Sequence, residues 1–376
     1  MSSSITVLET TTTLKMPTPT SSVRATSKQN SSSTSAQTLL LAYQSLGVIY
    51  GDISTSPLYV YSGTFAYMDH EPTKPDYVGV LSLIIWSLIV MVTLKYVNII
   101  FHADNDGEGG TFSCYLLISR YANIGNRDPR EGQTVLLRRH NTGDVNYGGR
   151  LVRFTLEHSK IFSGLLKTIA VVAVSMVISD GVLTPAQSVL GAVQGLTVTG
   201  KNISNSTVVG VTCAILIVLF CIQPFGTAKI GIVFAPIIII WLALNAGFGI
   251  YNLIQYDCTV LRAFNPGEAF VYLARNGEEG WRSLGGVLLA FTGVEALFAD
   301  LGAFSMRAIQ LSWLCYTLPC LLLSYCGQAA YMAVHPGAWS NSLYNCTPPG
   351  WLIPTIVIAV LAAVVASQAI ITATFQ

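Results

Sequence analysis

Long apolar runs separated by polar segments dominate the chain. The first run, residues 39–67, is interrupted near its middle by Gly51-Asp52-Ile53-Ser54-Thr55-Ser56-Pro57. Seven more follow, with approximate boundaries 79–101, 164–190, 207–223, 229–253, 285–305, 308–333 and 351–374. Each has about the 20 residues that a helix needs to cross a bilayer. The pattern therefore predicts an all-α membrane protein with eight spans.

The interruption of the first run has a chemical consequence. Gly51 suits the end of one helix, Ser56 the cap of the next and Pro57 its first position. We expect two half-helices that meet at Asp52. A carboxylate in mid-membrane is unfavourable unless it faces a partner or an ion. Together with unwound backbone carbonyls it suits a dehydrated cation, so this segment predicts a cation pathway.

Composition agrees with a membrane protein and excludes several classes. The 376 residues are 52% hydrophobic and only 10% charged, against roughly 25% charged in soluble domains. The net charge of +1 says nothing about nucleic acid, but no basic stripe with interleaved aromatic residues appears, so we expect no nucleic-acid partner. The five histidines lie in loops or at span ends, which argues against membrane di-iron enzymes and metalloproteases. We expect neither a cofactor nor an enzyme activity.

Basic residues predict the orientation. Segment 102–163 carries eight lysines and arginines, whereas 68–78 and 191–206 carry one each and 334–350 none. Positive residues favour the cytosolic side. We therefore expect a disordered cytosolic tail at 1–37, and a transmembrane domain at 38–376 with 102–163 as a cytosolic loop.

Glycosylation sequons support this orientation. Asn202, Asn205 and Asn345 each begin a sequon in a loop assigned to the outside, while the sequon at Asn30 lies in the tail and should stay unmodified. Cys258 and Cys346 also lie outside. Free thiols are the default for this pair, and a disulfide between them is the alternative.

A polar stripe follows the third span. Asp180, Thr184 and Ser188 are spaced at i, i+4 and i+8, so they share one face of a helix. The stripe lines a transport site or, alternatively, forms a hydrogen-bonded seam between helices.

The sixth span contains a second interruption, at Thr292 and Gly293, with Glu295 about one turn away. Interrupted helices at corresponding positions of two halves are typical of transporters built on inverted repeats. A partly buried carboxyl binds a proton readily, so Glu295 is the expected proton carrier and Asp180 a second proton-coupling residue.

The polar segment Asp104–Gly110 resembles the start of an EF-hand calcium loop. Its twelfth position would be Tyr115 rather than Glu, so the register fails. We expect a cytosolic loop with a structural or gating role.

Several motifs together resemble the KUP/HAK/KT family of potassium uptake permeases. They are GVIYGDISTSPLYVY, ADNDGEGGTFSCYLLISRYA, SDGVLTPAQSVLGAVQGL, GTAKIGIVFAPIIIIWLALNAGFGIYN, TGVEALFADLGAFSMRAIQ and LPCLLLSYCGQAAYM. They occur in order over residues 38–376. The resemblance implies the amino-acid–polyamine–cation transporter fold, with inverted repeats, and potassium uptake coupled to protons. By position it implicates as site residues Asp52, Tyr59, Thr184, Ser188, Thr292 and Glu295.

The chain departs from the family pattern in three ways. Gln194 stands where bacterial relatives carry an acidic residue, and Ser54 replaces the usual glycine, which should stiffen the segment. Family members have about twelve spans and a cytosolic C-terminal domain, whereas this sequence stops at Gln376 after the eighth span. We expect an incomplete second repeat.

The sequence therefore predicts a proton-coupled potassium transporter of the plasma membrane, with potassium on Asp52, Tyr59, Thr184, Ser188 and Thr292. A non-transporting potassium sensor or an inactive fragment is the main alternative. An amino-acid permease is disfavoured because Asp52 would repel a substrate carboxylate, and an intramembrane aspartyl protease because its GxGD signature is missing. Oligomeric state stays open, with a homodimer as one arrangement.

Overall fold

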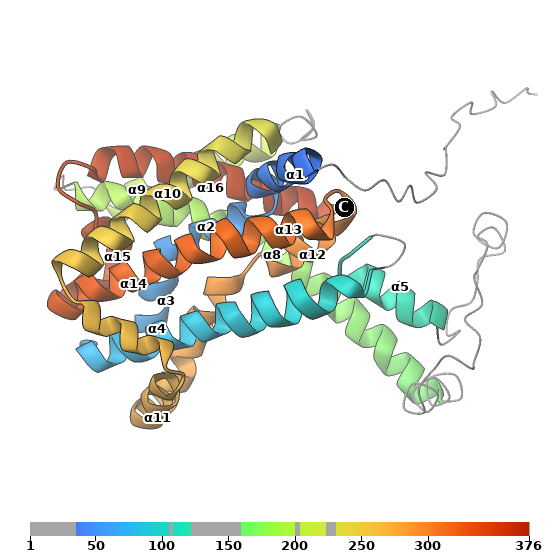
Figure 1. Ribbon diagram of the computed structural model, residues 1–376, viewed down its shortest axis with the longest axis horizontal. Helices are drawn as coiled ribbons and strands as arrows, with labels where there is room; N and C mark the ends of the chain where they lie inside the picture. Colours follow the sequence, from blue (N-terminus) through green and yellow to red (C-terminus); the bar gives the residue numbers. More distant parts are fainter. Residues whose placement is uncertain (1–34, 105–107, 122–158, 200–203, 223–230, 376) are drawn as a thin grey trace, which may run out of the picture.

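The computed structural model describes residues 35–104, 108–121, 159–199, 204–222 and 231–375. Within these ranges the chain is helical and contains no β-strand, which confirms the all-α prediction (Figure 1). Six described stretches are long and apolar enough to cross a membrane, namely Lys74–His102, Lys160–Val198, Phe234–Gln255, Gly267–Gly302, Met306–Val334 and Leu352–Ile371. Asn205–Cys221 is a shorter apolar helix. The count of eight spans stays a prediction.

The first apolar run is broken twice rather than once. It forms helices α1 (Ser35–Val48), α2 (Gly51–Thr55) and α3 (Val60–Phe65), with the 3-10 turn η1 (Ser56–Leu58) between the last two. The chain leaves the helix after Val48 and resumes it at Gly51, so the break lies just before the position predicted for it, and Asp52 is in the first turn of α2 rather than in an unwound segment. The hydroxyl groups of Ser54, Thr55 and Ser56 each donate to the carbonyl three residues earlier, which keeps this segment helical.

The next elements include a helix inside the predicted cytosolic loop. In chain order they are α4 (Lys74–Ser87), the π-helix η2 (Leu88–Ile99), η3 (Ile100–His102), α5 (Thr111–Tyr121), α8 (Lys160–Val198), α9 (Asn205–Ile222) and α10 (Gly231–Gln255). Helix α5 was not expected from the sequence, because its short length and modest hydrophobicity do not distinguish it from a loop.

The remaining elements contain the second interrupted span. They are η6 (Cys258–Phe264), α11 (Gly267–Leu288), η7 (Leu289–Phe291), α12 (Val294–Ala299), η8 (Asp300–Gly302), α13 (Met306–Ser312), the π-helix η9 (Trp313–Thr317), α14 (Leu318–Val334), η10 (Pro336–Asn341), α15 (Ser342–Asn345) and α16 (Leu352–Phe375). Helix α11 is kinked at Gly277, where φ is 50°. Its first half occupies part of the region predicted as an outer loop.

The helices pack as a bundle around the broken first run. Contacts join α10 to α14 and α1, and join α16 to α8 and α2. The backbones of α10 and α14 come close together at Gly249 and Gly327. A β-carbon on Gly327 would lie only 2.3 Å from the Cα atom of Gly249. The N-terminal half of α8 leaves the bundle and runs beside α5 (Figure 1). The most apolar window of this helix is not buried inside the protein.

All eight cysteines have free thiols, so the alternative of a Cys258–Cys346 disulfide is wrong. Each thiol of this pair bonds locally instead. Cys258 donates to the carbonyl of Leu253 and is exposed, whereas Cys346 donates to the carbonyl of Leu343 and is buried.

Candidate cation-binding site

Asp52 and Tyr59 carry buried oxygen atoms without partners. Asp52 is 1% exposed and Tyr59 is 8% exposed. Both carboxylate oxygens of Asp52 and the hydroxyl of Tyr59 lack a hydrogen-bond partner within the described part of the chain. Leaving such groups buried and unpaired is unfavourable by roughly 1–3 kcal/mol each, and more for a charge. These oxygens therefore suit a bound cation.

Two threonines lie near these oxygens but bond elsewhere. The hydroxyls of Thr55 and Thr292 lie close to Tyr59, and Thr292 also lies close to Asp52. Thr55 donates to the carbonyl of Asp52 at 2.9 Å, and Thr292 donates to the carbonyl of Leu289 at 3.2 Å. Both hydroxyl oxygens keep lone pairs, so they can join Asp52 and Tyr59 as cation ligands.

Four backbone carbonyls of α2 each accept a side-chain hydrogen bond. Those of Gly51, Asp52 and Ile53 accept the serine and threonine hydroxyls described above. The carbonyl of Ser54 accepts the indole N–H of Trp241 at 2.8 Å. The buried side-chain oxygens left without a partner here are those of Asp52 and Tyr59, and each of these carbonyls keeps a second lone pair, so backbone carbonyl ligands stay a prediction.

Helix α8 places its polar stripe against α2. Thr184 and Ser188 are buried, and Ser188 lies 3.1 Å from the Thr55 hydroxyl, oxygen to oxygen. Thr184 donates to Asp180 at 2.7 Å. The stripe thus forms a seam between helices and also reaches the residues around Asp52.

The second interruption, at Thr292 and Gly293, is confirmed. Gly293 has φ of 79°, a left-handed conformation that disfavours other residues. A β-carbon there would lie 2.5 Å from the Oδ2 atom of Asp52. The two interrupted segments therefore touch at Asp52 and Gly293, as expected for half-helices that share one site.

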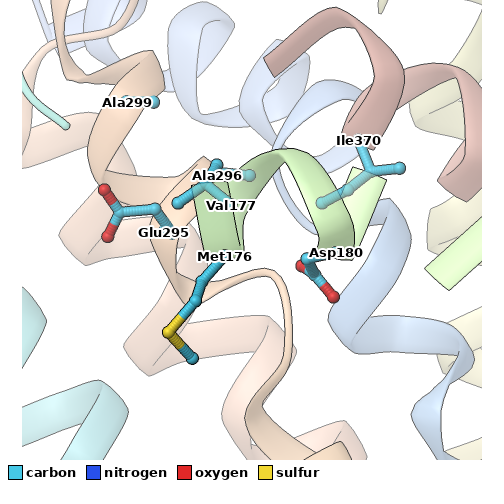
Figure 2. Close-up of a pocket in the computed structure, with 7 residues that line it drawn as sticks. All are labelled: Met176, Val177, Asp180, Glu295, Ala296, Ala299 and Ile370. Atoms are coloured by element: carbon cyan, nitrogen blue, oxygen red, sulfur yellow. The ribbon is translucent and has the colours of Figure 1, made fainter. Parts of the chain in front are cut away.

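Glu295 accepts its hydrogen bonds from elements other than α2. Its carboxylate accepts the backbone N–H of Thr111 at 2.6 Å, the Thr111 hydroxyl, and the Tyr96 hydroxyl at 3.3 Å. It also lines a cavity of about 200 Å³ between α8, α12 and α16, together with Asp180. Figure 2 shows the two carboxylates on facing elements and pointing in different directions. The structure thus separates Glu295 from the cluster around Asp52.

Sequence reasoning missed several residues that hold the site in place. Trp241 bonds to α2, and the Tyr325 hydroxyl lies 2.8 Å from the Ser56 hydroxyl oxygen. The Tyr61 hydroxyl donates to the Tyr325 carbonyl at 3.0 Å. An aromatic residue with a polar group inside a span is the only sequence signal for such roles, because its N–H or O–H needs a buried partner.

The predicted glycosylation sites differ in their surroundings. Asn202 lies outside the described residues, and Asn205 is exposed at the start of α9. Asn345 is half-buried, and its side-chain amide donates to the carbonyl of Ala338 at 3.0 Å. Of the two described sequons, Asn205 is therefore the more accessible.

The apolar helices and the buried oxygens between two interrupted helices define a multi-pass membrane protein of the transporter class. Residues 39–376 match the family model described as the K+ potassium transporter integral membrane domain. The chain belongs to this family, which contains membrane transport proteins rather than enzymes.

Curated plant relatives cover most of the chain. It is 47% identical over 351 residues to "Potassium transporter 5" of Arabidopsis thaliana, covering 90% of this chain and 43% of that protein. It is equally similar to "Potassium transporter 5" of Manihot esculenta and "Potassium transporter 27" of Oryza sativa subsp. japonica, covering 90% of the chain and 42% of each. The chain thus spans less than half the length of these relatives. No solved structure gives a significant match.

Proposed function

We propose that this chain forms the cation-binding part of a potassium transporter. The observation that carries the proposal is the set of three unpaired, buried oxygens on Asp52 and Tyr59. Thr292 on the second interrupted span, with Thr184 and Ser188 on α8, would complete an oxygen-rich environment for a dehydrated potassium ion. The names of the plant relatives favour potassium as the substrate.

The proposed uptake is a symport of potassium with protons. A potential of about 100 mV supplies roughly 2.3 kcal/mol per charge, which accumulates a monovalent cation about fifty-fold. High-affinity uptake from scarce potassium requires a further driving force. Glu295 and Asp180, which share the cavity beside α12, are the proposed proton-coupling residues.

We also propose that the protein lies in the plasma membrane with its N-terminus in the cytosol, as the distribution of basic residues predicts. This orientation places Asn205 outside. A glycosidase-sensitive mass shift that disappears in Asn205→Gln would support it. Modification at Asn30 instead would contradict it.

Rubidium uptake tests the proposed transport. Potassium-starved cells expressing the full-length gene product should take up rubidium faster at acidic than at alkaline external pH. Uptake without pH dependence would contradict the proposed proton coupling but not the proposed potassium transport. Tight binding of potassium by the purified full-length protein without any uptake would favour the sensor alternative.

A further inference from the structure

We propose that Thr111 is a positioning residue for Glu295, and that the turn Gly109-Gly110-Thr111 is a latch that holds α12 at the edge of the cavity. This inference rests on the proposed function, since it concerns the proton-coupling role of Glu295. The polar segment after the second span does not fit a calcium-binding loop. The proposal instead pairs the end of this segment with Glu295.

Three hydrogen-bonding groups surround the carboxyl group of Glu295. All three of its partners are donors: the Thr111 N–H and hydroxyl on one oxygen and the Tyr96 hydroxyl on the other. An ionised carboxylate only accepts hydrogen bonds, and bonds to it are about twice as strong as neutral ones. The Thr111 N–H is also at the first turn of α5, where a negative charge is stabilising.

The turn fits closely onto α12. A β-carbon on Gly109 would lie 1.9 Å from the carbonyl oxygen of Phe298, so no larger residue fits there. Gly110 adopts φ of 99° beside Ala299, a conformation that favours glycine. Ser113 donates to the carbonyl of Glu108, which ties the turn to α5.

Helix α12 connects this turn to the candidate cation site. Its N-terminal residue follows Gly293, which touches Asp52, and its C-terminal residue is Ala299, which lies beside Gly110. Glu295 and Ala299 both line the cavity of about 200 Å³ (Figure 2). Release of the turn would therefore free α12 to move at both the cavity and the cation site.

Protonation of Glu295 is the proposed release step. A proton from the water on one side binds a carboxylate oxygen, which removes the negative charge and weakens the bonds from Thr111. The same proton leaves to the opposite side when the turn docks again. The titratable groups of the described elements that lie near Glu295 are Tyr96 on η2, Cys114 on α5 and Asp180 on α8.

The test compares rubidium uptake against external pH in the full-length protein carrying Thr111→Val, Thr111→Ser or Thr168→Val. Thr168 is an exposed threonine whose hydroxyl bonds within α8, so its variant is the matched control. Thr111→Val removes a donor to the carboxylate, which makes Glu295 easier to protonate. The pH of half-maximal uptake should rise by about one unit. Thr111→Ser and Thr168→Val should keep the wild-type profile.

Each curve is scaled to its own maximum, so a change in expression does not move the midpoint. An unshifted midpoint in Thr111→Val, or an equal shift in Thr168→Val, overturns the inference and leaves the proposed transport intact. A wild-type curve without pH dependence overturns the proposed proton coupling and the latch with it. If Thr111→Val is inactive, Tyr96→Phe removes the other hydroxyl donor and must raise the midpoint; an unchanged midpoint there overturns the inference.

Discussion

Asp52 lies so close to Gly293 that a β-carbon on residue 293 would come within 2.5 Å of the Asp52 Oδ2 atom. The two residues are on the two interrupted segments, α2 and the turn before α12. Their contact joins the two halves of the candidate site. Within the described part of the chain, neither carboxylate oxygen of Asp52 has a hydrogen-bond partner.

Gly293→Ala should abolish or strongly reduce transport. Alanine in this left-handed conformation is unfavourable by about 1–2 kcal/mol, and its β-carbon would displace the Asp52 carboxylate. Rubidium uptake normalised to surface expression measures the effect. Gly285→Ala is the control, because a β-carbon on Gly285 meets no atom within 4 Å. Equal uptake in both variants would contradict the close contact.

Tyr59→Phe should weaken cation affinity without lowering stability, because the hydroxyl that it removes has no partner. Tyr344→Phe should show the opposite pattern. Its hydroxyl donates to the carbonyl of Ala192 at 2.8 Å, and loss of this bond should lower stability by about 1 kcal/mol. Rubidium KM and thermal unfolding of the purified variants distinguish the two. A destabilised Tyr59→Phe with normal KM would argue against a ligand role.

Trp241→Phe should destabilise the protein by about 1–3 kcal/mol, since it leaves the buried carbonyl of Ser54 without its donor. The site should also become less well ordered, because Ser54 lies two residues from Asp52. We expect a lower unfolding temperature together with a higher rubidium KM. Trp281→Phe, at an exposed position, is the control. Similar unfolding temperatures for the two variants would refute this role of Trp241.

The ion pair between Asp257 and Lys74 predicts a pH dependence of stability. Burial opposes ionisation, but hydrogen bonds from Lys74 and Thr259 hold the pKa of Asp257 below its ordinary value. The distance from the Lys74 Nζ atom to the Asp257 Oδ2 atom is 2.7 Å. Because the folded pKa is depressed, the stabilisation is present above the ordinary value of about 3.9 and is lost as pH falls through the folded pKa.

The difference in unfolding temperature between wild type and Asp257→Asn should therefore be largest near neutral pH and shrink below about pH 4. High salt should reduce the difference as well, because Lys74 is partly exposed. Unfolding followed in detergent across pH measures both effects. A difference that is constant with pH would exclude a contribution from the ionised pair.

Much of the helical framework could be predicted from apolar runs, because each long run must satisfy its own backbone in a membrane. The interruption at Gly293 was also predictable, since glycine beside a threonine in a span is a local signal. The break near Asp52 was predicted only approximately, because the chain leaves the helix after Val48 and resumes it at Gly51. The hydroxyls of Ser54, Thr55 and Ser56 bond to carbonyls three residues earlier, which keeps the segment after Asp52 helical.

The supporting contacts could not be predicted from sequence. Trp241 and Ser54 are 187 residues apart, and Thr111 and Glu295 are 184 residues apart. Such pairs depend on how helices that are distant in sequence pack together. The local sequence around one residue does not identify the residue that it contacts. The structure was therefore needed to separate the oxygens that are free at Asp52 from those that are already bonded at Glu295.

The most direct test of the central claim is rubidium uptake by the full-length protein carrying Asp52→Asn. Asparagine keeps the size of the side chain but removes the charge that attracts a cation. Asp257→Asn removes a carboxylate outside the candidate site and is the control. We predict near-background uptake in Asp52→Asn, with normal surface expression, and near-normal uptake in Asp257→Asn. Normal affinity and rate in Asp52→Asn would contradict the assignment of this residue to the cation site.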